Sequence, residues 1–449
     1  MTVIELGEIG AAGPEPEHHS ARSEFSPRSW RRWAASAVAL SCVLLLGASG
    51  LPDPPTVRHV WEVRLGTEYQ TTVRSDGVYV HQREGLETTV TRYELATGDV
   101  LWKRKFGQYP SYLAQGTEAG LLLLSGDEKY VEVDLEDGAK ATVVYDGTTT
   151  AIDADTGDEL WRQPGEVQNT AADTVLLADR TKKGDLSAIR VVGARDGGTV
   201  WQRRVPGAEQ LTIQLDGAQP VRVVASDPTG RVTVLRYSDG AVLAEKRIPW
   251  TRSRPNDGVF TYLTVANGLL MVVRQEAYAS KLAAYRVDTM EEVWSIDAAP
   301  YSYPQDCGPV LCVSETSVVH GVDPSSGRRV WDLPGRGNVM LVAPDRLLAS
   351  TSGPDTPHHI LADPATGAPI GSGGPGQPMP SPYGVDAVYM TNRIFGEGAA
   401  ISSVDRLDLR TGRMTRIGAA DGIEAGQCGT AGHYMGCDWG GRLVVTTFG

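Results

Sequence analysis

A short pattern, Asp-x-x-Thr-Gly-x-x-x-Trp, recurs along most of the chain and constrains its fold more than any other feature. Its clearest copy runs from Asp153 through Thr156 and Gly157 to Trp161. Glycine takes a positive φ without steric cost, and the oxygens of Asp and Thr can bond nearby backbone N–H groups, so Thr-Gly predicts a tight turn. Apolar residues flank the turn and predict two antiparallel strands, and the tryptophan is large enough to pack on a neighbouring sheet.

The pattern occurs both with and without its tryptophan. Five copies end in a tryptophan, namely Trp102, Trp161, Trp201, Trp294 and Trp331. Three more copies keep only the turn, at Gly240, Gly367 and Gly412. The turns recur about every 45 residues with only β-type sequence between them, which predicts a radial or solenoidal array of β units. Four short strands and their turns fill such a unit, which is the size of a β-propeller blade.

The two ends of the repeat region complement each other. Residues 59–66, which contain Trp61, are typical of the strand after a turn, but no hairpin precedes them. After Gly412 the chain ends with three strands and lacks a fourth. We therefore predict that the Trp61 strand completes the last blade and closes the ring, so that no sheet edge is open. A literal count gives eight full blades and a composite ninth. Because blades normally number four to eight, we expect an all-β propeller of eight four-stranded blades, within a range of seven to nine.

A segment without charged residues, 33–51, precedes the repeats. It is long enough to cross a bilayer as a helix, and Arg28, Arg31 and Arg32 stand just before it. The positive-inside rule then predicts a single-pass protein of the cell membrane, with a cytoplasmic N-terminus and an extracytoplasmic propeller. Cleavage after the small residues 48–50 is the alternative.

These features divide the chain into four parts. Residues 1–32 are poor in large apolar side chains and predict a disordered cytoplasmic tail. Residues 33–51 form the predicted transmembrane signal anchor, residues 52–58 a proline-rich linker, and residues 59–449 the propeller. The formal net charge is -13, from 42 basic and 55 acidic residues, which argues against a nucleic-acid-binding surface on the propeller.

Four of the five cysteines form two pairs in the exported part. Cys307 with Cys312, and Cys428 with Cys437, lie at the same place in their repeats, about 15 residues after a turn. Export to an oxidising compartment favours disulfides, each joining the first two strands of a blade. A zinc site would need closer CxxC-like spacing or histidine partners, and neither is present.

No catalytic or metal-binding constellation stands out. The histidines His81, His320 and His433 are spread over different repeats, and we expect packed or surface imidazoles. Residues 371–376 match GxGxxG by letter, but the prolines that follow exclude the helix that a dinucleotide site needs, so we expect a loop there. We expect no resident cofactor.

One insertion lengthens the second repeat. Residues 129–145 are typical of two strands around an Asp-Gly turn, which predicts a hairpin that projects from its blade. Its acidic side chains make it a candidate contact site. A solvated hairpin without a partner is the alternative.

The repeat over residues 59–449 resembles the tryptophan-docking repeat of quinoprotein-type (PQQ-like, BamB-like) β-propellers, which implies a bacterial protein. In that family the tryptophan of one blade stacks on the next, and the BamB-type member is a membrane-tethered assembly scaffold without catalysis. The resemblance therefore implies a non-catalytic scaffold that binds a protein or cell-envelope component. A diverged PQQ-dependent dehydrogenase is one alternative, although those that oxidise alcohols carry adjacent cysteines and this chain has none. A sensory ectodomain is the other.

Overall fold

The computed structural model describes residues 57–448 except residues 86, 108–109, 118, 135–139, 255–256, 352–355, 380–385, 395–400 and 422–427. All described residues belong to the second of two compact units, Pro55–Gly449. The predicted tail (1–32), the predicted transmembrane helix (33–51) and the linker up to residue 56 lie outside the described residues. Within the described part, no helix has the length and apolar character needed to cross a membrane.

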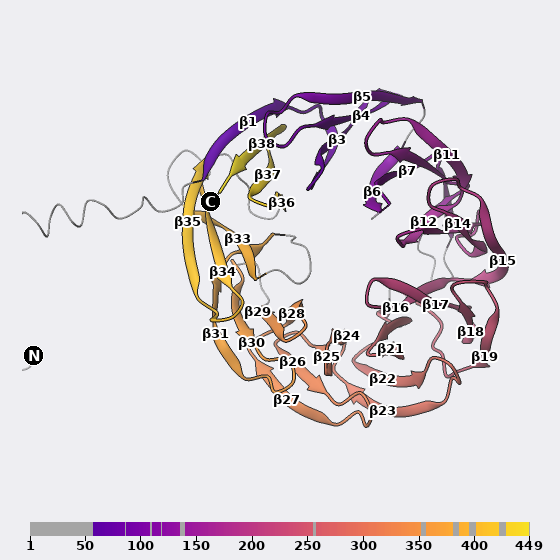
Figure 1. The fold of residues 1–449 in the computed structure, drawn as a ribbon. Coiled ribbons are helices and arrows are strands. Elements are labelled where there is room, and N and C mark those ends of the chain that lie inside the picture. Colours follow the sequence, from indigo (N-terminus) through magenta and orange to yellow (C-terminus); the bar gives the residue numbers. More distant parts are fainter. Residues whose placement is uncertain are drawn as a thin grey trace, which may run out of the picture. The chain divides into compact units, whose positions relative to one another are not determined.

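The described residues form nine four-stranded antiparallel sheets, arranged as the blades of a ring, and one two-stranded sheet (Figure 1). The all-β propeller is confirmed, but the expected number of eight blades is wrong. The literal count of the repeats was correct, because each of the eight turns belongs to a complete blade. The composite ninth blade is complete as well.

The strands of the blades follow the chain order. Blade 1 consists of β2 (Glu68–Arg74), β3 (Gly77–Glu84), β4 (Glu87–Tyr93) and β5 (Val100–Gly107), blade 2 of β6 (Pro110–Thr117), β7 (Leu121–Gly126), β10 (Thr148–Asp153) and β11 (Glu159–Pro164), and blade 3 of β12 (Glu166–Thr170), β13 (Thr174–Arg180), β14 (Leu186–Gly193) and β15 (Thr199–Ala208). Blade 4 consists of β16 (Gln210–Asp216), β17 (Gln219–Ser226), β18 (Arg231–Arg236) and β19 (Val242–Arg247), blade 5 of β20 (Phe260–Ala266), β21 (Leu269–Glu276), β22 (Ala279–Arg286) and β23 (Glu292–Ala298), and blade 6 of β24 (Tyr303–Cys307), β25 (Val310–Ser314), β26 (Val318–Val322) and β27 (Arg329–Pro334). Blade 7 consists of β28 (Asn338–Ala343), β29 (Arg346–Ser350), β30 (His358–Ala362) and β31 (Pro369–Pro375), blade 8 of β32 (Gln377–Pro378), β33 (Ala387–Ile394), β34 (Ile401–Asp408) and β35 (Met414–Asp421), and blade 9 of β36 (Cys428–Ala431), β37 (Tyr434–Trp439), β38 (Arg442–Thr447) and β1 (Arg58–Arg64).

Strand β1 closes the ring as the sequence predicted. It pairs antiparallel with β38, from Arg58 opposite Thr447 to Arg64 opposite Arg442. A second contact joins the first blade to the last, where the Tyr69 hydroxyl donates a hydrogen bond to Asp438 over 2.6 Å. This hydrogen bond raises the pKa of Tyr69 to about 12. The closing blade is thus held by backbone pairing and by a side-chain contact across the seam.

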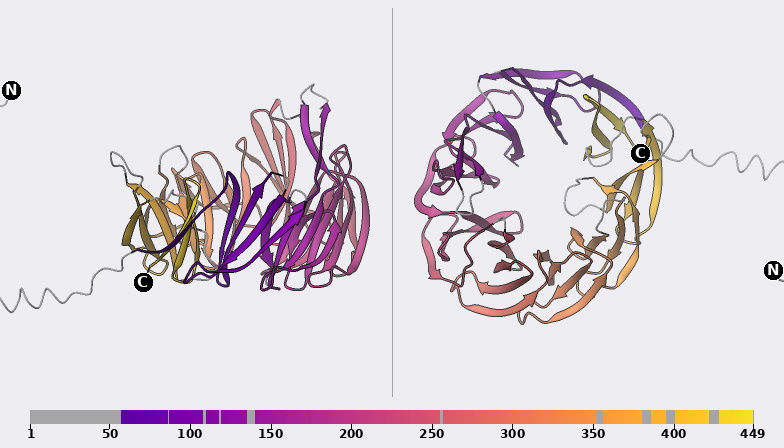
Figure 2. Two further views of the ribbon diagram at one scale, coloured as in Figure 1. Left: turned by 90° about the horizontal axis from the view of Figure 1, so that it is seen from above. Right: turned by 180° about the vertical axis from the view of Figure 1, so that it is seen from behind.

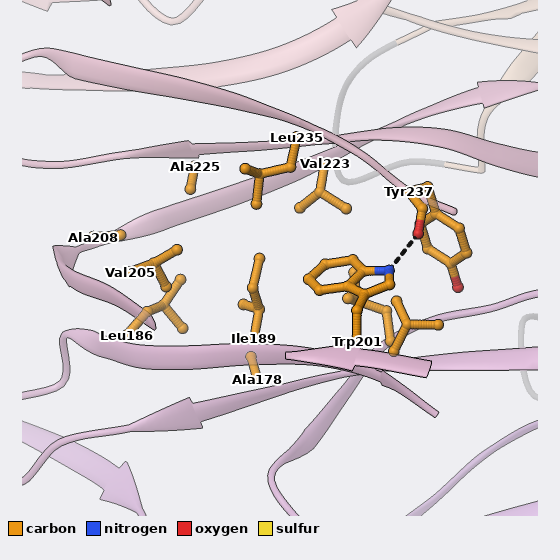
Figure 3. Close-up of a cluster of buried hydrophobic side chains, with 12 residues drawn as sticks. Ala178, Leu186, Ile189, Trp201, Val205, Ala208, Val223, Ala225, Leu235 and Tyr237 are labelled. Atoms are coloured by element: carbon orange, nitrogen blue, oxygen red, sulfur yellow. Dashed lines mark hydrogen bonds between the residues drawn. The ribbon is translucent and has the colours of Figure 1, made fainter. Parts of the chain in front are cut away.

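The core lies between adjacent blades. The second strands carry continuous apolar runs, such as residues 121–124 of β7, which are buried because each sheet is covered on both faces. Figure 3 shows one such interface, where Ile189 and Trp201 of blade 3 pack against Val223 and Leu235 of blade 4. Apolar side chains that interlock between neighbouring sheets hold the ring together.

The strand order gives the ring two distinct faces. Strands alternate in direction, so the Thr-Gly turns before the fourth strands all lie on one face, which we call the turn face. The turns between second and third strands and the connections between blades lie on the other, which we call the connector face. Strand β1 starts and β38 ends on the turn face. The inserted hairpin of β8 (Lys129–Asp134) and β9 (Lys140–Tyr145) follows a second strand and projects from the connector face (Figure 2, left).

The GxGxxG segment does not form the expected loop. Most of it lies in strand β31, which pairs with β30. A Cβ added to Gly371 would lie 2.8 Å from the Cα of Gly412 in the next blade. Gly371 therefore permits a close approach of two backbones.

The buried imidazole of His359 predicts acid sensitivity. Its Nε2 donates to the Gly376 carbonyl and its Nδ1 accepts from the Ser350 hydroxyl, each over 2.7 Å. Burial lowers the pKa of His359, so below about pH 6.5 the unfolded chain takes up a proton that the folded chain does not, and stability falls as the pH decreases. We expect the melting temperature of His359→Gln to change less than that of the wild type between about pH 7 and 5. His358→Gln, at the exposed neighbour, is the control, and equal pH slopes for all three proteins would contradict the prediction.

Candidate functional site

All six repeat tryptophans form the same contact with the following blade. Each is buried, and its indole Nε1 donates to a backbone carbonyl three residues before the next turn glycine. The pairs are Trp61 with Leu95, Trp102 with Ala154, Trp161 with Ala194, Trp201 with Tyr237 (Figure 3), Trp294 with Pro324 and Trp331 with Pro364, at 2.6–3.0 Å. The resemblance implied this stacking, and the structure confirms it. These residues are therefore structural.

The turn glycine and the tryptophan of the preceding blade form one packing unit. Gly157 has a φ of 74°, and a Cβ there would lie 2.7 Å from Cδ2 of Trp102. Any larger side chain at this position would have to displace the indole. The sequence motif joins Gly157 to Trp161 of the same blade, but the physical partner is the tryptophan about one repeat earlier.

Two interfaces that lack the tryptophan are filled in other ways. In blade 4, Ala244 takes the tryptophan position, and the facing turn of blade 5 has the fully buried Met290 at a φ of 55°. The Lys246 ammonium donates to the Met290 carbonyl over 2.9 Å. In blade 7, Gly371 meets Gly412, and Arg346 Nε donates to the Leu409 carbonyl over 2.6 Å. At the interface of blades 4 and 5, the missing turn glycine and the missing tryptophan are thus partners.

Both predicted disulfides are present. Cys307 and Cys312 join β24 to β25, with their Cα atoms 5.7 Å apart. Cys428 and Cys437 lie directly opposite each other on β36 and β37. Each bond connects the first two strands of its blade, as the repeat position indicated. Both have a structural role.

A cluster of aromatic side chains lies on the connector face where blades 5 and 6 meet, and we call it the tyrosine platform. It consists of Phe260 and Tyr262 of β20 with Tyr301 and Tyr303 beside the start of β24. Ring centroids of neighbouring members lie 6.1–6.3 Å apart, and Tyr262 stacks on Tyr303. Tyr301 is 64% exposed and Tyr303 is 51% exposed, whereas tyrosine side chains are on average of intermediate burial.

Buried polar groups hold the platform in place. The backbone N–H of Tyr301 donates to Oε1 of the fully buried Gln275 over 2.8 Å. The Tyr262 hydroxyl donates to the Ser302 carbonyl over 2.8 Å, and burial raises the pKa of Tyr262, so this phenol stays neutral. Tyr301 itself has a φ of 61°, which costs a non-glycine residue free energy and persists only where its surroundings enforce it.

A third exposed tyrosine lies near the platform in sequence and on the same face. Tyr278, at the turn between β21 and β22, is 92% exposed. None of these aromatic residues was predicted from the sequence as a site. The alternation in Phe260-Thr-Tyr262 was a usable signal, because residues two apart on a strand point to the same side.

Comparison with known proteins assigns the family. A family model described as outer membrane protein assembly factor BamB matches residues 87–333, from the start of β4 into β27. The chain belongs to this BamB-like propeller family. No curated protein sequence matches the chain.

Several solved structures resemble this BamB-like propeller in fold. BamB from Moraxella catarrhalis is 14% identical with a TM-score of 0.40, over 88% of this chain and 98% of its own. A eukaryotic initiation factor is 11% identical with a TM-score of 0.52, over 84% of this chain and 92% of its own. A quinohemoprotein alcohol dehydrogenase from Pseudomonas putida is 13% identical with a TM-score of 0.34, over 68% and 72%. At such identities the likeness concerns the fold alone.

The remaining candidates of the BamB-like chain do not assemble into one site. His81 and His320 are buried in blades 1 and 6, and His433 is exposed beside Tyr434. His320 lies between the carboxylates of Glu315 and Asp332. No group of three or more His, Cys, Asp or Glu in the described part of the chain is arranged to hold a metal ion. The hairpin β8–β9 forms as expected, and Lys182 of blade 3 lies 5.6 Å above its Tyr145 ring.

Proposed function

We propose that this protein is a non-catalytic scaffold of the cell envelope that binds a protein partner through the tyrosine platform. It is tethered to the cell membrane by residues 33–51, with the propeller outside the cytoplasm. The observation that carries the proposal is Tyr301, which the fold keeps exposed in a strained backbone conformation. Strain and exposed aromatic surface together point to a selected function, since neither stabilises the folded chain.

The chemistry of the platform suits a protein partner. Tyrosine is enriched at protein interfaces because it supplies a large contact area, a polar hydroxyl and few rotatable bonds. The hydrogen bonds to Gln275 and Ser302 hold the backbone of the platform in place before a partner binds. Little conformational entropy of this segment is therefore lost on binding. The family description, which names an assembly factor, supports the same class of function.

The platform and the point where the described chain enters the ring lie on opposite faces of the propeller. The chain enters the ring at Val57, next to the start of β1 on the turn face. The platform lies on the connector face, as does the hairpin β8–β9. The described chain therefore enters the ring on the face opposite the platform.

Site-specific crosslinking tests this function. We expect a photo-crosslinking phenylalanine analogue at Tyr303 of the full-length protein in cells to capture a defined protein, identified by mass spectrometry. Tyr301→Ala should abolish the capture by the Tyr303 analogue and leave the melting temperature nearly unchanged, since Tyr301 is exposed. The matched control is the same analogue at Tyr130, which is 60% exposed on the hairpin.

Two outcomes would contradict the proposal. The first is capture at Tyr303 that Tyr301→Ala leaves unchanged. The second is enzymatic turnover, seen as dye reduction by the purified protein with pyrroloquinoline quinone, calcium and a panel of alcohols and sugars. That result would favour the diverged dehydrogenase over the scaffold.

A further inference from the structure

A groove on the turn face opens between blades 4 and 5, away from the tyrosine platform. It has a volume of about 630 Å³, which is within the usual range for ligand sites. Its polar wall consists of Arg222, Arg236, Ser238 and Asp288, and its apolar wall includes Val221 and Leu243. We propose that this groove binds a monoanionic carboxylate that carries an apolar group.

The groove lies at an interface without a docking tryptophan. Leu243, on its apolar wall, precedes Ala244, and the corresponding residue in six other blades is the buried tryptophan. Met290 takes up the space next to Ala244, but Leu243 and Val221 still border the groove. An apolar group of a ligand placed between these side chains would leave water, which is the usual driving force for binding in such a site.

The charges of the lining favour a monoanion. Arg222 pairs with Asp288 and Arg236 pairs with Asp239, so these four side chains are neutral together. A carboxylate that takes the place of Asp239 on Arg236 adds one negative charge beside Asp288, whereas a dianionic phosphate would add two. A guanidinium can bind both oxygens of a carboxylate in one plane, and the Ser238 hydroxyl can add another hydrogen bond.

The two arginines differ in how firmly they are held. Arg222 pairs with Asp288 of blade 5, and its Nη1 donates to Gln214 over 3.0 Å. Its Nε is buried without a partner, an unsatisfied donor that folding alone does not explain. Arg236 bonds to Asp239 over 2.7 Å and is half exposed, so its guanidinium can turn toward a ligand. A partly buried guanidinium and a half-exposed one thus border the same apolar wall.

Ligand binding to the full-length protein tests the groove. N-acetyl-leucine is the probe, and its neutral amide, N-acetyl-leucinamide, is the comparison, with affinities measured by calorimetry and ligand-observed NMR. We expect the carboxylate to bind at least about tenfold more tightly than the amide, because hydrogen bonds to a charged group are the stronger ones. A peptide with a free C-terminal leucine, and its C-terminal amide, distinguish a polypeptide end from a small acid as the source of the carboxylate.

Substitutions test whether the probe binds in the groove or elsewhere on the protein. Leu243→Trp fills the groove and should abolish binding, whereas Leu160→Trp, the same change at the same repeat position of blade 2, should not. Arg236→Gln should remove the preference for the carboxylate, and Arg222→Gln should weaken binding while also losing the contact with Asp288. Equal affinities for acid and amide, no binding of either probe, or binding that survives Leu243→Trp would each overturn the proposal. None of these results depends on the tyrosine platform.

Discussion

Gly197→Ala is expected to destabilise the propeller by about 3–5 kcal/mol, as much as the loss of a buried tryptophan. Gly197 has a φ of 65°, and an added Cβ would lie 2.6 Å from Cγ of Trp161 in the preceding blade. The ring of Trp161 is buried and its Nε1 is bonded to the Ala194 carbonyl over 2.7 Å, so it cannot move aside without losing both packing and hydrogen bond. Urea or thermal unfolding measures the effect.

Gly217→Ala is the matched control for the free-energy cost of placing alanine at a positive φ. Gly217 has a φ of 60°, and an added Cβ there would meet nothing within 4 Å. We expect it to cost only the left-handed backbone penalty, about 1–2 kcal/mol. Similar losses for both alanine variants would show that the contact with Trp161 contributes nothing.

A double mutant isolates the contact itself. Trp161→Ala alone should cost about 3–5 kcal/mol, and Gly197→Ala in that background should cost little beyond the backbone penalty. Strictly additive losses would contradict a shared packing unit.

The sequence predicted the architecture because the architecture is a repeat. Each Thr-Gly turn marks a local structure that needs no distant partner, so the four-stranded unit and its period follow from the chain alone. Closure by Trp61 was also predictable, because a strand without a hairpin matched three strands without a fourth. The expected number of blades was wrong because the usual maximum of eight blades was preferred to the nine repeats counted in the sequence. Every repeat forms a complete blade.

The candidate sites depend on contacts that the sequence does not show. Tyr301 lies in the connection between blades 5 and 6, and Gln275 of β21 accepts a hydrogen bond from its backbone N–H, which helps to hold its positive φ. The partner of each turn glycine lies in the preceding blade, so the absent tryptophan at Ala244 and the absent glycine at Met290 looked like independent losses. The groove beside Leu243 follows from that compensation and from the pairing of Arg222 with Asp288, which lie 66 positions apart in the sequence.

The interface between blades 4 and 5 should accept the repeat motif only when both partners change. Ala244→Trp alone places an indole against Met290, which is fully buried, and we expect it to cost about 3 kcal/mol or more from overpacking. Met290→Gly alone removes a buried side chain and should cost about 2–5 kcal/mol, partly offset by relief of the positive φ of Met290.

The double variant Ala244→Trp/Met290→Gly restores the arrangement found at the six tryptophan interfaces. Its indole can lie over the glycine and donate to the Val287 carbonyl, the residue three before the turn position. We therefore expect most of the stability lost in either single variant to return, with a coupling energy of about 2–3 kcal/mol in unfolding measurements. The reverse exchange, Trp161→Ala with Gly197→Met, is the matched control and should recover part of the loss caused by Trp161→Ala. If the double variant were as unstable as the sum of its single changes, Met290 would not be the replacement for the missing tryptophan, and the compensation inferred at this interface would be wrong.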